Sequence, residues 1–213
     1  MDFHVFQLTM ELILASGSPR RQAMLRDLGV AFKVIAPDID ETRLRGEPAQ
    51  VFVQRLAKEK AESVVGKLQR SADTNWAVLA ADTIVVYNKL VLGKPVDADD
   101  AVKMLKKLSG RTHDVLTAYA WIGAQGGKAR VTAAHVRTKV KFAEQGVDFW
   151  KWYVSTGEPM DKAGAYAAQG IGISFIEKVS GSYSNVIGLP LPQVLASYRK
   201  AFGGDLREHC RQS

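Results

Sequence analysis

Two spacings of apolar residues alternate along the chain and divide it into expected strands and helices. Runs of apolar and β-branched residues between turn-forming residues predict strands at 12–15, 30–36, 76–87, 113–123, 129–143 and 173–179. Apolar residues at helical spacing predict helices at 19–28, 48–65, 98–108, 147–155 and 191–201. Because helices and strands are interleaved and segment 88–95 predicts a hairpin, the pattern indicates an α/β fold with a mixed sheet flanked by helices.

Residues with positional preferences mark several ends of these elements. Ser18 can cap the helix that follows it, and Pro19 suits the first helical turn, where a missing N–H costs nothing. Asp97 can cap the helix at 98–108 in the same way. Turn chemistry therefore supports the boundaries that the hydrophobic spacing gives.

The strand predicted at 129–143 carries its charge on one face. In its second half, two sets of residues alternate and so point to opposite faces of the strand. One face carries Val136, Thr138, Val140 and Phe142, and the other carries the basic residues Arg137, Lys139 and Lys141. The whole chain has a formal net charge of +7. This balance favours an anionic partner, but it does not choose between nucleic acid, a nucleotide and a membrane surface.

Length and composition fit one large domain or two closely joined lobes. The chain has 213 residues, of which 46% are hydrophobic. No apolar run approaches the ~20 residues of a membrane span, and the first residues lack the pattern of a secretory leader. With Cys210 as its single cysteine, the chain can form no internal disulfide, so we expect a cytoplasmic protein that does not bind membranes.

The turn at 16–21 (SGSPRR) places two arginines in the first turn of a helix. Cations oppose the helix dipole at that position, by ~0.3–1 kcal/mol for each unscreened charge, so Arg20 and Arg21 are poor stabilisers there. They suit an anion such as a polyphosphate, because a guanidinium can bind two phosphate oxygens at once. The competing interpretation is an ordinary solvated helix end.

Asp82 interrupts an apolar, strand-forming run. A carboxylate in such a stretch is costly unless it is paired, bound to metal or protonated. It could be an aspartate at a strand end that accepts backbone N–H groups. The functional interpretation is a general base, or a ligand to a hard cation such as Mg²⁺.

Lys60 shares the apolar stripe of the helix predicted at 48–65. From the residues alone, a lysine there more often directs its amine outward to solvent than into a cleft. Lys94 lies in a turn before a proline and could be an ordinary exposed lysine. The glycine-rich segment 157–170 suits either a loop that approaches a ligand closely or a plain surface loop. Zinc spacing, a P-loop and a nucleophile elbow are all missing from the sequence.

An ordered set of motifs resembles the Maf family of nucleotide pyrophosphatases. The motifs are ASGSPRR, ADTIV, LGKP, SGRTHDVLT, GEPMDKAGAY, QG and SGSYSNVIGLP. The resemblance runs over about residues 12–201 and implies a Maf-like (ITPase-like) fold, an elongated mixed sheet with two lobes around a deep cleft. We expect one such domain at 11–203, with terminal extensions at 1–10 and 204–213.

The resemblance also implies roles for individual residues. It makes Asp82 the proton acceptor and, with Glu41, a ligand of a divalent cation (Mg²⁺ or Mn²⁺), although Asp40 is another candidate for the acidic loop position. It assigns phosphate binding to Ser16, Arg20, Arg21, Lys60 and Lys94, which favours the cleft for Lys60. It assigns base preference to Arg20, Thr83 and Gln169, and the versions SPRR, ADT and GAYAAQG resemble the branch acting on dTTP and UTP.

The expected activity is therefore hydrolysis of a nucleoside triphosphate, dTTP, UTP or a modified pyrimidine nucleotide, to the monophosphate and pyrophosphate. Asp82 would activate the attacking water.

Two other classes of protein remain open at this point. A nucleic-acid-binding protein would explain the positive charge but not Asp82, so we expect no stable nucleic-acid complex. A regulator of septum formation in cell division would act through protein partners. A homodimer is suggested by the resemblance only.

Overall fold

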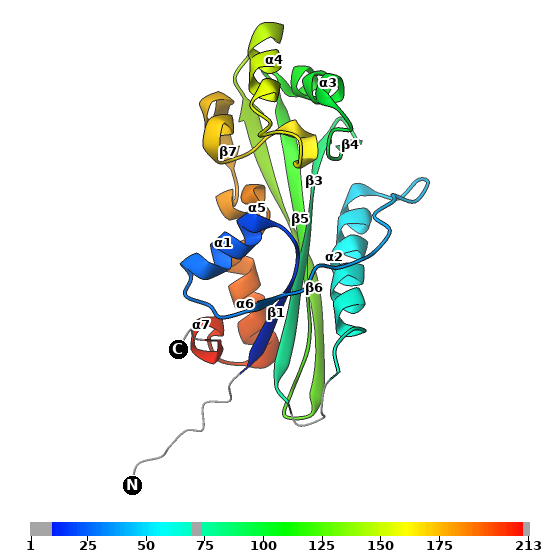
Figure 1. Cartoon of the computed structure of the whole chain (residues 1–213), viewed down its shortest axis with the longest axis vertical. Helices are drawn as coiled ribbons and strands as arrows, with labels where there is room; N and C mark the ends of the chain where they lie inside the picture. The colour runs from blue at the N-terminus through cyan, green and yellow to red at the C-terminus, as the bar shows by residue number, and fades with distance from the viewer. Residues whose placement is uncertain (1–9, 70–73, 211–213) are drawn as a thin grey trace.

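The computed structural model describes residues 10–69 and 74–210, and in this part of the chain the strands form one elongated mixed sheet (Figure 1). Its order is β2-β1-β3-β5-β6-β7, with β4 also paired to β3. The strands are β1 (Glu11–Ala15), β2 (Lys33–Val34), β3 (Trp76–Tyr87), β4 (Leu90–Leu92), β5 (Thr112–Gln125), β6 (Lys128–Phe142) and β7 (Ile176–Ser180). β1 is parallel to β2 and β3, whereas the remaining pairs are antiparallel.

Helices cover both faces of this sheet. They are α1 (Pro19–Asp27), α2 (Ala49–Val65), α3 (Ala98–Leu108), α4 (Val147–Ser155), α5 (Tyr183–Ile187), α6 (Leu191–Phe202) and α7 (Leu206–His209), with 3-10 turns at η1 (Ala163–Ala165) and η2 (Gly170–Phe175). In Figure 1, α2 lies on one side of the lower sheet, α1, α6 and α7 lie on the other, and α3 and α4 lie at the top. The α/β class predicted from the sequence is confirmed.

The buried residues divide into three apolar clusters that follow this layering. Below the middle of the sheet, one cluster joins α1, α6 and α7 to one face, and a second joins α2 to the other face. The third cluster lies around Phe142, Trp150 and Phe175 in the upper part. Successive residues of β3 alternate between the faces, since Leu79 packs with the α1 side and Ala80 packs with the α2 side.

One edge of β3 is left open at its centre, and this gap positions the site. β5 pairs with the whole of one edge, from Trp76 to Val86. On the other edge, β1 pairs with residues 76–80 and β4 pairs with residues 85–87. Residues 81–84 therefore have no strand beside them on that edge among the described residues. Both faces of the sheet can be reached from this gap.

Several predicted boundaries match the structure, and two strands do not. The helices at 98–108 and 147–155 and the strand at 76–87 are confirmed. The strand expected at 30–36 shortens to Lys33–Val34, because this exposed edge strand pairs only with the end of β1. The strand expected at 173–179 is Ile176–Ser180, because residues 170–175 form 3-10 turns instead.

One further expectation needs correction. Ser18 occupies the N-cap of α1, but its side chain makes no capping hydrogen bond, and its backbone N–H donates to Ser16 Oγ at 3.2 Å. Beyond residue 203, Leu206 of α7 and Cys210, the residue that follows α7, are buried in the α1-side cluster. Of the expected N-terminal extension, residues 1–9 lie outside the described residues. No helix of the described chain is long and apolar enough to cross a membrane.

Candidate active site

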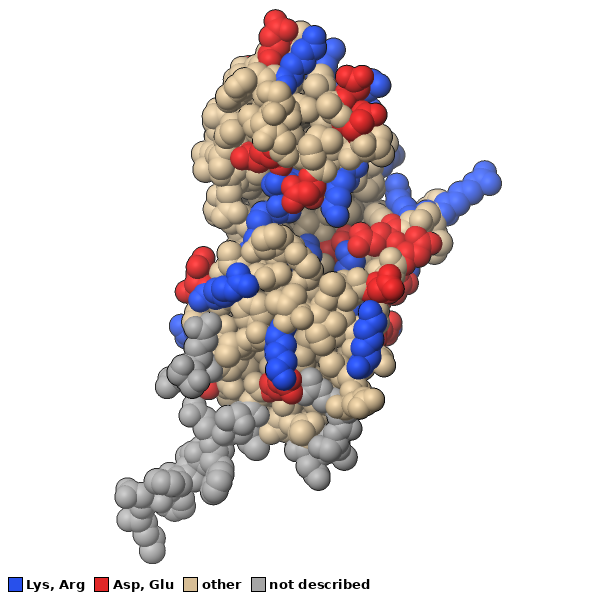
Figure 2. Space-filling model, in the orientation of Figure 1, with Lys and Arg blue, Asp and Glu red and all other residues tan. Residues whose placement is uncertain are grey.

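The open edge of β3 borders a cavity of about 630 Å³. Its walls come from the β1–α1 turn, α2, β3, the segment after β4 and the loop before η2, and they include every site residue predicted from the sequence: Ser16, Arg20, Arg21, Glu41, Lys60, Asp82, Thr83, Lys94 and Gln169. Figure 2 shows basic and acidic side chains gathered around the hollow between the upper and lower parts of this face. The fold thus brings together residues that are up to 153 positions apart in the chain, from Ser16 to Gln169.

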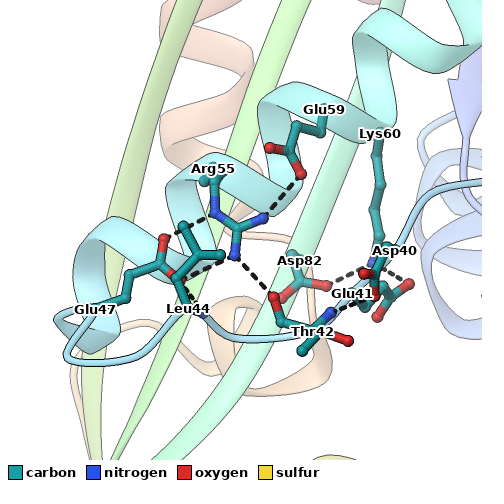
Figure 3. Close-up of polar contacts among 9 residues, drawn as sticks. All are labelled: Asp40, Glu41, Thr42, Leu44, Glu47, Arg55, Glu59, Lys60 and Asp82. Atoms are coloured by element: carbon teal, nitrogen blue, oxygen red, sulfur yellow. Dashed lines mark hydrogen bonds and ion pairs between the residues drawn. The ribbon is translucent and has the colours of Figure 1, made fainter.

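On the α2 side of β3, one buried ammonium joins two carboxylates. Lys60 Nζ donates to Asp82 Oδ1 at 2.7 Å and lies 2.8 Å from Glu41 Oε1 (Figure 3). The side chains of Lys60 and Asp82 are 9% and 10% exposed, so little water competes for this pair. Lys60 therefore points into the cleft rather than outward to solvent, which the residues alone did not favour.

Of the two acidic candidates in the loop, Glu41 contacts Lys60, whereas Asp40 makes a local contact. Asp40 Oδ1 accepts the backbone N–H of Thr42 at 2.8 Å, which closes a local turn. Hydrogen bonds from the side chain and the backbone of Thr42 lower the pKa of Asp40. Asp40 does not line the cavity, whereas Glu41 does. The two candidates left open by the sequence have separate tasks: Asp40 shapes the loop, and Glu41 reaches Lys60.

On the opposite side of β3, Arg21 is held by three hydrogen bonds. Its Nε donates to the carbonyl of Gly188 at 2.7 Å, and its two terminal nitrogens donate to Ser16 Oγ at 3.2 Å and Thr83 Oγ1 at 3.1 Å. Burial lowers the pKa of Arg21, and the charge of Asp82 acts in the opposite direction. A guanidinium has five N–H groups, so two remain beyond these three bonds for an anion in the cleft.

Thr83 continues this network into the sheet. Its hydroxyl lies 2.9 Å from Thr117 Oγ1, which donates to the backbone carbonyl of Asn185 at 2.9 Å. Asn185 is fully buried, and its Nδ2 donates to the carbonyl of Val115 at 3.1 Å. Thr83, expected to set base preference, is thus part of the support of Arg21. Thr117 and Asn185 were not predicted, because no local pattern reveals a contact across 68 residues.

Arg20, next to Arg21 in the same helical turn, is much freer. It forms an ion pair with Asp161 at 3.2 Å, in which the side chains are 29% and 62% exposed. Lys94 and Gln169 are exposed residues of the cavity wall. These three side chains can turn toward a ligand without breaking a buried contact.

The glycine-rich segment predicted at 157–170 is fixed by one carboxylate. Glu158 accepts hydrogen bonds from Tyr153 Oη at 2.8 Å and from the N–H groups of Ile171 and Gly172 at 2.9 Å each. These contacts join the start of the segment to the residues just after it, so the cavity wall around Ala167 is held in place. Sequence reasoning missed Glu158, whose partners include two backbone groups.

The basic residues on the exposed face of β6 are paired with carboxylates. Arg137 and Lys139 both pair with Asp114, and Lys141 pairs with Glu177 at 2.8 Å. These ion pairs offset the charge that the sequence pattern suggested for nucleic-acid binding.

The carboxylates of the cavity can be tested as ligands for a divalent cation. The described residues contain no cluster of three or more His, Cys, Asp or Glu side chains able to hold a metal. They do contain Glu41 and Asp82, whose carboxylates lie 2.8 and 2.7 Å from the same Lys60 ammonium. Mg²⁺ is commonly bound by one or two carboxylates together with substrate phosphates, so this pair fits a cation that arrives with a polyphosphate.

Comparison with known proteins identifies a family that this chain matches over most of its length. The model of the family described as "Maf-like protein" matches residues 11–201. A protein named dTTP/UTP pyrophosphatase from Anaeromyxobacter dehalogenans (strain 2CP-1 / ATCC BAA-258) is 50% identical over 190 residues, covering 89% of this chain and 93% of the relative. Relatives with the same name come from Hahella chejuensis, 47% identical over 90% of this chain and 92% of the relative, and from Syntrophus aciditrophicus, 45% identical over 97% and 98%.

Proposed function

This chain belongs to the Maf-like protein family, and from that premise we propose that it is a nucleoside triphosphate pyrophosphatase acting on dTTP and UTP. The reaction converts the triphosphate to the monophosphate and pyrophosphate. Identities of 45–50% over about nine tenths of the chain, to relatives named for this activity, support the assignment.

The observation that carries the proposal is the pairing of Asp82 with Lys60 at the open edge of β3. Asp82 Oδ1 accepts a hydrogen bond from the Lys60 ammonium at 2.7 Å, which leaves its second oxygen for another partner. The cations Arg20, Arg21 and Lys94 line the same cavity. A base and a set of cations facing one hollow are the groups that hydrolysis of a phosphoanhydride requires.

In the proposed reaction, Asp82 accepts a proton from the water that attacks the α-phosphorus. The bond from that phosphorus to the bridging oxygen breaks, and pyrophosphate leaves. Lys60 and the arginines offset the negative charge that collects on the departing oxygens. A divalent cation, which we propose is held by Glu41 and Asp82, would supply Lewis-acid polarisation of the phosphate oxygens when bound.

We propose that the preference for a pyrimidine base comes from the exposed part of the cavity wall. Gln169 is exposed there, and its amide offers both a donor and an acceptor to the edge of a pyrimidine. Thr83 would act indirectly, because its hydroxyl is engaged by Arg21 and Thr117. We also propose a cytoplasmic location, supported by the free buried Cys210, and a homodimer, supported by the family resemblance.

The test is pyrophosphate release from a panel of triphosphates with Mg²⁺ or Mn²⁺, with Asp82→Asn beside the unmodified protein. We expect release from dTTP and UTP, and a fall of about 10²–10⁴-fold in the variant, because general-base catalysis is worth that much. Asp27→Asn, at an exposed position of α1, is the matched control and should keep full activity. Release from no triphosphate would refute the function, and a variant with more than about a tenth of the activity would refute Asp82 as the base.

A further inference from the structure

The loop that carries Glu41 has no regular secondary structure, yet Glu41 Oε1 lies 2.8 Å from Lys60 Nζ. The loop runs between β2 and α2, and Leu44 at its tip is 60% exposed. An irregular exposed segment pays conformational entropy to hold one side chain in place. Some contact must fix the backbone beside Glu41.

Arg55 of α2 makes that contact (Figure 3). Its Nε and one terminal nitrogen bind the two carboxylate oxygens of Glu47, at 2.8 and 2.9 Å. The same terminal nitrogen also donates to the backbone carbonyl of Thr42 at 3.1 Å, one residue after Glu41. The remaining terminal nitrogen binds Glu59 at 3.0 Å. One guanidinium thus connects the helix to both ends of the loop segment 42–47.

Glu47, at the end of the loop segment, binds both Arg55 and the loop backbone. It is 7% exposed, and its carboxylate also accepts the backbone N–H of Leu44 at 3.1 Å. Its backbone carbonyl accepts a hydrogen bond from Arg43 Nε at 2.9 Å. The forked bond from Arg55 lowers the pKa of Glu47 and raises that of Arg55, so the pair stays charged across the range in which the enzyme would work.

The residue that binds the loop and the residue that Glu41 contacts both belong to α2. Arg55 and Lys60 are five positions apart on the helix, a rise of roughly 7.5 Å, and they point in different directions. Lys60 lines the cavity, whereas Arg55 does not line it and instead contacts loop segment 42–47. Because a helix is stiff, the anchor of the loop and the cation that Glu41 must meet are held at a fixed separation.

Attachment of α2 to the sheet does not depend on Arg55. The helix packs through the apolar residues Val53, Leu56, Ala57 and Val64, which are at most 2% exposed. Arg55 lies on another side, 22% exposed at its side chain. Three of its hydrogen bonds go to the loop, whereas Glu59 and the ring of Phe52, 5.6 Å from the guanidinium carbon, are its contacts within α2.

We propose that Arg55, together with Glu47, is a positioning residue that places the Glu41 carboxylate at Lys60 and Asp82. This inference rests on the proposed function, because it assigns Arg55 to the same reaction through Glu41. Arg55 itself touches no group that would react.

A double-mutant cycle with Glu41 tests the assignment. We would measure kcat and KM for dTTP with Arg55→Gln, Glu41→Gln and the double variant. Arg55→Gln should lower kcat/KM by about 10- to 100-fold, since displacement of a catalytic group by about 1 Å can cost 10²-fold. In the Glu41→Gln background the same change should have less than about a twofold effect, because the group it positions is gone. Effects that multiply instead would overturn the proposal.

Two conservative variants separate geometry from charge. Arg55→Lys keeps the ion pair with Glu47 but loses the fork that also reaches Thr42, so its activity should lie between those of Arg55→Gln and the unmodified protein. The control is Glu62→Gln, which removes the exposed ion pair with Lys58 on the same helix and should leave the kinetics unchanged. Equal activity of Arg55→Lys and Arg55→Gln would contradict the role of the fork.

Hydrogen exchange gives a readout that needs no enzymatic activity. In Arg55→Gln, exchange at the N–H groups of Thr42 and Leu44 should accelerate at least about tenfold, while N–H groups of α2 stay within about twofold. Unchanged exchange at both loop N–H groups would overturn the anchor even in an active enzyme. If the unmodified protein released no pyrophosphate, the proposed function would fail, and this exchange result would still show whether Arg55 holds the loop.

Discussion

Asp82 and Thr83 are neighbours on β3, yet they lie in two very different surroundings. Asp82 points to the α2 side of the sheet, where Lys60 donates a hydrogen bond to it. Thr83 points to the opposite side, where its hydroxyl contacts both Arg21 and Thr117. The alternation of a β-strand produces this division, and the open edge of β3 lets both sides face one cavity.

The difference between the two sides indicates a division of tasks. On the α2 side, each of two carboxylates has one contact with a single ammonium, so the groups can exchange partners when a ligand enters. On the other side, three nitrogens of Arg21 are already bonded, and Thr117 and Asn185 extend the network into the core. We interpret the first side as the one that carries the reacting carboxylate and the second as a support that holds Arg21 in place for an anion, and three measurements can separate them.

The largest effect is expected on the reactive side, from Lys60→Met. The variant keeps the length of the side chain but leaves Asp82 and Glu41 without their shared cation. Loss of one charge-stabilising donor typically costs 10²–10³-fold in kcat, and we expect about that loss in pyrophosphate release. Lys58→Met, at an exposed position on the same helix, is the matched control. Activity within tenfold of the unmodified protein would remove Lys60 from the reactive side.

A smaller effect is expected on the free energy of unfolding when the pH falls, because of the buried His113. This residue is 2% exposed, its Nε2 lies 2.9 Å from Tyr166 Oη, and burial lowers its pKa from 6.5 to about 4. As the pH falls through 6.5, the unfolded chain takes up a proton that the folded chain refuses. The free energy of unfolding should therefore decrease between pH 6.5 and about 4, by about 3 kcal/mol in total.

Urea unfolding across this pH range measures the effect. His113→Gln cannot titrate and should remove most of the pH dependence in that window, while His135→Gln, at an exposed position of β6, should not. An identical pH dependence in the His113 variant would show that other groups cause the acid sensitivity.

The smallest effect separates the adjacent arginines. Arg21→Gln leaves the Gly188 carbonyl and the hydroxyls of Ser16 and Thr83 without their donor, and we expect a loss of about 2 kcal/mol in the free energy of unfolding. Arg20→Gln removes an exposed ion pair and should cost less than about 0.5 kcal/mol. Equal losses in urea unfolding would contradict the division between a supporting Arg21 and a free Arg20.

Local signals predicted most of the elements. The helix predicted at 48–65 is Ala49–Val65 with Gly66 at its end, and Asp97 caps α3 through the N–H of Asp100 at 2.8 Å. Such features depend on residues within one or two turns, so they can be recognised in the sequence. The edge strand β2 and the 3-10 turns before β7 were mispredicted, because strand pairing and the Glu158 contacts decide them.

The candidate site was partly visible as a set of anomalies. Asp82 in an apolar strand, Lys60 on an apolar stripe and two arginines at a helix N-terminus each contradict the preference of their surroundings. The ordered motifs then pointed to the family that the comparison identifies. Residues without such a contradiction, including Arg55, Glu47 and Glu158, gave no signal, since charged residues are ordinary at the surface of a helix or loop.

The sequence by itself determined the α/β class, most helix and strand boundaries and the residue types that a polyphosphate site needs. These follow from hydrophobic spacing, turn chemistry and local electrostatics, which act between near neighbours. The tertiary structure alone decided that Glu41 rather than Asp40 meets Lys60, that Arg21 is braced by Gly188 and that Arg55 holds the loop. Each of these contacts joins separate elements, and its geometry exists only after the sheet has left one edge of β3 open.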